Sequence, residues 1–243
     1  MEDKEIIFGR NPVFEYLKSS AHQEGAEVYI ADHAHGKIID EIRAEAGRKK
    51  IPLVTRDKNF FHSLGPSSRH QGVAMKIPGN GGRGDADLLL HAAARKGVLV
   101  MLDQITDPHN AGAIIRTAEA LGCDGIVIPK SHSSGITPTV IKAAAGATAH
   151  IGIAMVPNAA AFIDRAKEAG FWVIGTTDHG DRVPDGLNSI RPALVIIGSE
   201  GSGMRRLTEE KCDYRVRIPL KGKVSSLNAS VAAGIILYEI MKS

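Results

Sequence analysis

Three separate segments of the chain carry residue types from which a ligand site could be built. The last of them, residues 218–235, begins with a proline and a glycine, continues with Ser226 and Asn228, and is then almost unbrokenly apolar to Met241. Serine and asparagine cap helix starts. The unpaired amides of a helix start beside a glycine loop can bind a carboxylate or phosphate. This segment predicts a strand, a loop and a helix buried on most of its surface, with an anionic group held at the helix start.

The first segment, residues 102–118, supplies an asparagine and an arginine. Asn110 is placed to cap or begin a helix, and Arg116 follows within two turns, so both could serve one site at the start of that helix. The spacing also fits a surface salt bridge between Arg116 and either Glu119 or Asp103. Both interpretations of Arg116 stay open at this point.

The second segment, residues 195–203, is an apolar strand that runs into three glycines and one carboxylate, Glu200. Glycines let the backbone approach a ligand closely. Their order, Gly-x-x-Gly-x-Gly, differs from the dinucleotide-binding fingerprint. Taken alone, this loop indicates a close backbone contact and no particular ligand.

An α/β fold with a mainly parallel sheet would bring the three segments together. The run at 98–102 is fully apolar, as in strands that are covered by helices on both faces. Because the carboxyl ends of parallel strands share one edge of a sheet, the segments that follow three of these strands should meet there. We expect strands at 98–102, 125–129, 150–156, 171–176, 193–198 and 214–218, with helices near 87–96, 111–121, 138–145, 159–169, 205–211 and 229–241.

A separate small α/β domain is expected at residues 1–77. Its pattern predicts helices near 9–17, 36–48 and 57–63 and strands at 27–31, 52–55 and 72–77. The glycine-rich stretch 78–86 reads as a linker to the second domain, 87–243. Basic residues gather in the first domain, and they form either a solvated helix face or an RNA-binding face: Arg43, Arg48, Lys49, Lys50, Arg56, Lys58 and Arg69, with His70 beside them.

Composition excludes several classes of protein. The 243 residues carry a net charge of +3 and a pI of about 8.8, which favours polyanionic partners slightly. Cys123 and Cys212 are too few and too distant for a disulfide framework or a zinc knuckle, and no histidine cluster has metal-ligand spacing. The charged start and the lack of a long apolar run argue against a signal peptide or a membrane helix, so we expect a cytoplasmic protein.

Taken together and in this order, the three segments resemble a known family. Asn-x-Gly-x-x-x-Arg at 110–116, Ile-Gly-Ser-Glu-Gly-x-Gly at 197–203 and Ile-Pro-x-x-Gly-x-x-x-Ser-Leu-Asn-Ala-Ser at 218–230 are similar to the motifs of the SpoU (TrmH) family of RNA ribose methyltransferases. The resemblance covers residues 98–243. The opening Gly-x-Asn-Pro-Val-x-Glu-x-Leu at 9–17 looks like the start of the family's substrate-binding domain, which is akin to a ribosomal-protein RNA-binding fold.

This resemblance implies a fold, a cofactor and an assembly. The fold would be of the SPOUT type, an α/β sheet with a trefoil knot near the carboxyl terminus, and the knotted loops would hold S-adenosyl-L-methionine in a homodimer. The residues that match the family's cofactor contacts are Gly198, Ile218 and Leu227, and those that match its active-site positions are Asn110, Arg116, Glu200, Ser226 and Asn228. One departure is Ser202, where relatives often carry a charged residue.

The same resemblance implies methyl transfer to a ribose 2′-hydroxyl. The greatest likeness is to the member that methylates a guanosine in large-subunit ribosomal RNA. A transfer-RNA methyltransferase and a non-catalytic ribosomal-RNA-binding assembly factor are the alternatives. The family proposal makes the arginine matched by Arg116 a base, but a guanidinium offers only donors. We expect Arg116 to grip the phosphate beside the target ribose instead.

Overall fold

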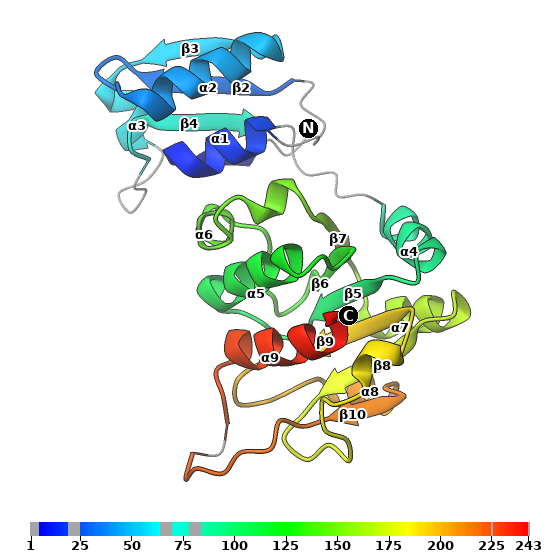
Figure 1. The fold of residues 1–243 in the computed structure, drawn as a ribbon. Coiled ribbons are helices and arrows are strands. Elements are labelled where there is room, and N and C mark those ends of the chain that lie inside the picture. The colour runs from blue at the N-terminus through cyan, green and yellow to red at the C-terminus, as the bar shows by residue number, and fades with distance from the viewer. Residues whose placement is uncertain (1–4, 19–24, 64–69, 78–83, 225, 243) are drawn as a thin grey trace. The chain divides into compact units, whose positions relative to one another are not determined.

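The computed structural model describes residues 5–18, 25–63, 70–77, 84–224 and 226–242. The chain divides into two compact units (Figure 1). The first comprises residues 1–81 together with 145–150, and the second comprises residues 82–144 and 151–243. Most of the predicted glycine linker lies outside the described residues, and so does Ser225.

The first unit is a sheet with helices between its strands. Among the described residues the strand order is β1-β4-β2-β3; β2 and β3 are parallel, and β4 is antiparallel to both of its neighbours. The core side chains of α2 recur at helical spacing, with Ile39, Ile42 and Ala46 buried. Its elements are β1 (Glu5–Phe8), α1 (Arg10–Lys18), β2 (Glu27–Ala31), α2 (Lys37–Arg48), β3 (Leu53–Arg56), α3 (Lys58–Ser63) and β4 (Val73–Ile77), and the short helix η1 (Ala147–Ala149) is grouped with them.

The second unit contains a six-stranded sheet in the order β10-β8-β9-β5-β6-β7. All of its strand pairs are parallel, as the apolar strands predicted, so their carboxyl ends share one edge. Its elements are α4 (Asp85–Ala94), β5 (Val98–Leu102), α5 (Pro108–Ala120), β6 (Gly125–Pro129), α6 (Pro138–Ala143), β7 (Gly152–Val156), α7 (Ala159–Glu168), β8 (Trp172–Thr176), η2 (Leu187–Ser189), β9 (Ala193–Ile197), α8 (Arg206–Glu210), β10 (Tyr214–Val216) and α9 (Ala229–Met241).

Helices cover both faces of this sheet (Figure 1). Leu99 and Met101 of β5 pack into one buried cluster with apolar side chains of α4 and α7, including Leu88 and Phe162. On the other side, α5 packs against both α6 and α9. The approach of α5 to α6 depends on Gly112, where an added Cβ would lie 2.4 Å from Ala143 Cβ.

Two sequence expectations need correction here. The helix expected at 111–121 begins three residues earlier, at Pro108, because Asp107 accepts a hydrogen bond from the His109 amide and Pro108 suits the first turn. Helix α9 is not buried on most of its surface. Val231, Ile235 and Tyr238 recur on one face and are 51%, 38% and 60% exposed.

Candidate active site

Asn228 joins the three segments that the sequence predicted to meet. Its Nδ2 donates to Asn110 Oδ1 at 3.0 Å and to Glu200 Oε2 at 3.1 Å. These partners follow β5 and β9, while Asn228 itself caps α9. The cap is made by Asn228 Oδ1, which accepts from the amide and the hydroxyl of Ser230. One side chain therefore holds together three loops at the carboxyl edge of the sheet.

Of the two positions expected for Asn110, at the cap or at the beginning of the helix, the structure has the second. Asn110 is the third residue of α5, after the Asp107 cap, so its side chain is free to accept from Asn228. A capping role would have occupied that side-chain oxygen. The structure thus gives Asn110 a contact across the site in place of a local one.

The glycine loop after β9 closes on itself. Ser199 and Gly203 exchange two backbone hydrogen bonds of 3.0 and 3.1 Å. An added Cβ at Gly198 would lie 2.5 Å from the Gly203 carbonyl carbon, so only glycine fits there. The hydroxyls of Ser199 and Ser202 are 2.6 Å apart, which places Ser202, the departure from the family pattern, in a hydrogen bond within the loop.

A buried carboxylate that the sequence analysis named only as a possible partner of Arg116 fixes this loop to β5. Asp103 is fully buried at the end of β5, and its Oδ2 accepts from the Arg205 amide at 2.8 Å. The Arg205 guanidinium also approaches Asp103 Oδ1, with Nε at 3.4 Å. The sequence did carry a signal for this residue, a lone Asp directly after a fully apolar strand. A charge buried at the end of such a strand needs a partner, so an ion pair or hydrogen bond could have been expected there.

A cleft of about 330 Å³ lies beside the contact that joins the three loops, and it is lined by the segments that follow β8, β9 and β10 and by α9. All three predicted cofactor residues, Gly198, Ile218 and Leu227, line it, and so do Glu200 and Ser226 of the predicted active site. Much of the wall is apolar, from residues of β9, β10 and α9 and the loops beside them: Ile197, Met204, Val216, Ile218, Leu220, Leu227 and Ile236. A cleft of this size, apolar with a few polar groups, is typical of a small-molecule site.

Arg116 lies apart from this cleft. It is exposed on α5, and within the described ranges it forms no hydrogen bond or ion pair, so neither proposed salt bridge is present there. Asp103, one of the two candidate partners, pairs with Arg205 instead. Asn110 and Asn228 border the site through their mutual hydrogen bond and do not line the cleft.

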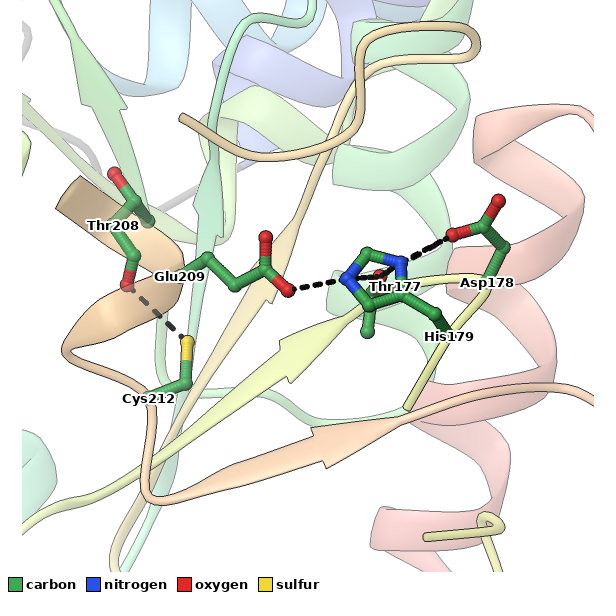
Figure 2. A network of polar contacts seen from close by, with 6 residues as sticks. All are labelled: Thr177, Asp178, His179, Thr208, Glu209 and Cys212. Atoms are coloured by element: carbon green, nitrogen blue, oxygen red, sulfur yellow. Dashed lines mark hydrogen bonds and ion pairs between the residues drawn. The ribbon is translucent and has the colours of Figure 1, made fainter. Parts of the chain in front are cut away.

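Four further polar residues that the sequence analysis missed line the cleft: Thr177, Asp178, His179 and Glu209 (Figure 2). His179 Nδ1 is 2.7 Å from Asp178 Oδ1, and His179 Nε2 is 2.9 Å from Glu209 Oε1. Hydrogen bonds that His179 donates to Asp178 and Glu209 raise the pKa of His179, and the bond from His179 lowers the pKa of Asp178. The Thr-Asp-His run after an apolar strand was a usable signal, but Glu209, 30 positions away, was not.

The cysteines are no candidates for nucleophiles. Burial raises the pKa of Cys123 and of Cys212 to about 12, so both thiols stay protonated. The Cys212 thiol also donates to the Thr208 carbonyl oxygen (Figure 2). In the described part of the chain, no group of three His, Cys, Asp or Glu side chains could hold a metal ion, and no helix is long and apolar enough to span a membrane.

The residues of the cleft suit S-adenosylmethionine. The apolar wall of the cleft can accept a purine, and Glu200, Asp178 and Glu209 can face cationic or hydroxyl groups of the cofactor. The Gly198 turn, which a Cβ would fill, leaves room for close backbone contact.

Residues 97–238 match the SpoU rRNA methylase family, and residues 6–80 match a domain described as RNA 2′-O ribose methyltransferase substrate binding. Among similar proteins, YacO of Bacillus subtilis, assigned to the TrmH family of tRNA/rRNA methyltransferases, is 36% identical over 99% of this chain and 96% of its own length. A Staphylococcus haemolyticus protein with the same assignment is 39% identical over 100% of this chain and 96% of its own.

Solved structures share the fold. The SpoU methyltransferase AviRb from Streptomyces viridochromogenes, crystallised with AdoMet, has a TM-score of 0.78 and 24% identity over 98% of this chain and 89% of its own. An AdoMet-bound rRNA methyltransferase from Sinorhizobium meliloti has a TM-score of 0.74 and 22% identity, over 98% of this chain and 86% of its own. At these identities the likeness concerns the fold alone.

Proposed function

Because the chain belongs to the SpoU rRNA methylase family, we propose that it transfers a methyl group from S-adenosylmethionine to a ribose 2′-hydroxyl of RNA. The observation that carries this proposal is the Asn110–Asn228–Glu200 contact beside a cleft lined by Gly198, Ile218 and Leu227. Relatives that are 36% and 39% identical to this chain are named as TrmH-family tRNA/rRNA methyltransferases. Calorimetry with S-adenosylhomocysteine is the first test, and absence of binding would favour the assembly-factor alternative.

The cofactor supplies an electrophilic methyl group when it is bound. In this chain Gly198, Ile218 and Leu227 would hold it, chiefly through the backbone, and would align its methyl with the hydroxyl. The ribose oxygen would take this methyl group in exchange for its hydroxyl proton, and the sulfur of the cofactor would keep the electron pair. Alignment provides much of the acceleration.

Arg116 would act on the RNA side of this reaction. An exposed guanidinium is a bidentate donor for phosphate and cannot accept the proton near neutral pH. We propose that it grips the phosphate beside the target ribose and stabilises the forming alkoxide, while an RNA phosphate oxygen or water takes the proton. The test is the pH dependence of kcat. If kcat falls with a pKa near neutrality, and if this pH dependence is absent in Arg116→Lys, the proposed phosphate grip is contradicted.

Glu200 would order the site. Its Oε2 accepts from Asn228, which in turn donates to Asn110, so the carboxylate fixes the loop that follows β9 against α9. We expect Glu200→Gln to weaken binding of S-adenosylhomocysteine in calorimetry. Intact binding with abolished turnover would show instead that the carboxylate acts in the chemistry.

The first unit would bind the RNA. The match over residues 6–80 to a substrate-binding domain supports this role. Arg56 lies over the rings of Tyr29 and Phe60, and a hollow of about 590 Å³ is lined in part by Arg10, His33 and His35. Arg48 in the predicted basic cluster is instead paired with Glu45, and Arg69 lies outside the described residues. Guanidinium and aromatic groups together suit phosphates and bases.

We propose a guanosine of large-subunit ribosomal RNA as the target, acted on in the cytoplasm. The added RNA-binding unit favours ribosomal RNA over transfer RNA, since a compact transfer-RNA enzyme could work without it. Relatives are named for both substrates. Mass-spectrometric mapping of ribose methylation in rRNA and tRNA from cells that lack the protein decides the substrate: loss of one large-subunit Gm supports the proposal, and loss confined to tRNA contradicts it.

We further propose that the carboxyl-terminal stretch is threaded as a trefoil knot and that two chains form a homodimer. The return of residues 218–228 to the β9 loop and to Asn110 is consistent with threading. The exposed apolar face of α9, formed by Val231, Ile235 and Tyr238, offers a surface for a second copy. A single molecule pulled from both ends would stay shorter than its full contour length if it is knotted.

A further inference from the structure

A row of polar side chains on the β8 side of the cleft takes no part in the chemistry proposed above. Thr177, Asp178 and His179 directly follow β8, and Glu209 reaches the row from α8 (Figure 2). All four line the cleft. In the sheet, β9 lies between β8 and β5. At roughly 4.8 Å per strand, the end of β8, where this row begins, is therefore about 10 Å from the end of β5, which leads to Asn110.

The hydrogen bonds of His179 define its charge. Nδ1 faces a carboxylate oxygen of Asp178 at 2.7 Å, and Nε2 faces one of Glu209 at 2.9 Å. The Thr177 hydroxyl also lies 2.9 Å from Nδ1. Carboxylates only accept hydrogen bonds, so the two carboxylate contacts favour the imidazolium, which can donate from both ring nitrogens. It therefore ties the carboxylate of Glu209 to the loop after β8.

Glu209 keeps one oxygen available to a ligand. Oε1 is held by His179, whereas Oε2 forms no hydrogen bond or ion pair with any residue that the structure describes. The side chain is 22% exposed, and apolar residues such as Met204 and Val216 share the cleft with it. A carboxylate oxygen in such surroundings is a strong acceptor that lacks part of its water.

We infer that Glu209 accepts hydrogen bonds from the ribose hydroxyls of the bound nucleoside cofactor, and that His179 is the positioning residue that orients it. This inference rests on the proposed function. A ribose offers two adjacent hydroxyl donors, and a carboxylate is the group with which dinucleotide-binding folds hold a ribose hydroxyl. The imidazolium keeps the Glu209 side chain in one orientation, so little rotamer freedom is lost when the ligand binds.

The test compares two ligands on the full chain. Calorimetry measures the dissociation constants of S-adenosylhomocysteine and of its 2′,3′-dideoxy analogue for the unaltered protein and for Glu209→Ala. The matched control is Glu210→Ala on the same helix, because Glu210 is 53% exposed, pairs with Arg206 and does not line the cleft. The unaltered protein and the control should prefer the ribose form by about tenfold or more.

In Glu209→Ala the preference should fall to about one, because the ribose form loses affinity and the dideoxy form does not. A preference that persists, or an equal loss for both ligands, would overturn the inference. Weakened binding of S-adenosylhomocysteine with unchanged binding of 5′-methylthioadenosine would overturn it too, since Glu209 would then bind the amino-acid part. No binding of S-adenosylhomocysteine to the unaltered protein would refute the proposed function itself, and the inference with it.

The positioning role of His179 has its own readout. His179→Ala should narrow the ribose preference without removing it, because Glu209 loses its fixed orientation. His179→Gln carries an amide donor in place of Nε2 and should restore most of the preference. An unchanged ribose preference in His179→Ala would refute the positioning role and leave only Glu209 in the inference.

Discussion

At the scale of single residues, Asn228 has two structural roles, and each depends on a different atom of its side chain. Its Oδ1 caps α9 through Ser230, and its Nδ2 links Asn110 with Glu200. Capping stabilises the helix, whereas the link orders three loops around the cleft. A substitution that keeps one atom and removes the other can therefore separate fold from function.

We predict that Asn228→Ala lowers the free energy of unfolding by about 1 kcal/mol through loss of the cap. Asn228→Ser keeps a capping oxygen, so its stability should stay within about 0.5 kcal/mol of the unaltered protein. Both variants should lose methyl transfer at least about tenfold, since neither can bridge Asn110 and Glu200. Urea unfolding and single-turnover methylation measure the two effects. Full activity in Asn228→Ser would rule out a role for the bridge.

His179 should make stability depend on pH in one direction. Its pKa is raised by hydrogen bonds to Asp178 and Glu209, so its stabilisation is complete below the unfolded value of about 6.5 and is lost as pH rises through the higher folded value. His179 lowers the pKa of Asp178, so the contribution of Asp178 to the free energy of unfolding is present above about pH 3.9 and is lost as pH falls.

The measurement is the pH dependence of urea unfolding for the unaltered protein and His179→Gln, together with an NMR titration of His179. The stability difference should be largest between about pH 4 and 6.5 and should vanish above the folded pKa of His179. A folded pKa at or below about 6.5 would contradict the paired imidazolium.

Sequence reasoning about single residues succeeded where a motif joined them. The segments carrying Asn110, Glu200 and Asn228 were expected to meet, and they do. It placed the start of the helix near 111 instead of at Pro108, because the stronger start signal, Asp107-Pro108, was passed over. It could not find Glu209, since no local pattern says that an acidic residue of α8 reaches the loop after β8.

At the scale of elements, Gly112 sets how closely α5 and α6 pack. An added Cβ would lie 2.4 Å from Ala143 Cβ and 2.7 Å from the Val140 carbonyl oxygen, so one of the helices must move. Since α5 carries Asn110 and also packs on α9, such a shift would reach the site.

We predict that Gly112→Ala lowers the free energy of unfolding by about 1–3 kcal/mol, the usual cost of overpacking. The matched substitution is Gly47→Ala in α2, where a Cβ meets nothing within 4 Å. It should stabilise its helix by about 0.5–1 kcal/mol, because alanine is the better helix former. Calorimetric unfolding of both variants gives the comparison, and a Gly112→Ala variant as stable as the unaltered chain would disprove the tight contact.

Most elements of the fold could be predicted from the sequence, because apolar runs bounded by glycine, proline or capping residues mark their limits. The strands at 27–31, 98–102 and 125–129 and the helix at 229–241 have the expected bounds. Strand β1 was missed, because three apolar residues beside a charged terminus carry little periodicity. The exposed face of α9 was missed because an almost wholly apolar helix does not tell which side is covered.

At the scale of the whole molecule, the apolar face of α9 predicts self-association. Ile235→Glu would place a charge among Val231, Ile235 and Tyr238, which should shift the chain from twice its 25.9 kDa mass to its single mass in sedimentation. The control is Leu90→Glu on α4, a side chain 66% exposed outside this face, which should remain dimeric. A monomeric unaltered protein would contradict the homodimer.

The contact between Asn110 and Asn228 spans 118 positions of the chain, and this separation governs when the cleft can exist. A ribosome makes a protein from its amino end, so the strands of the first unit are all present once Ile77 has left the exit tunnel. None of the residues that line the cleft has been made at that stage, and the last of them emerge with α9. A nascent chain can thus carry every strand of its first unit long before its cleft is complete.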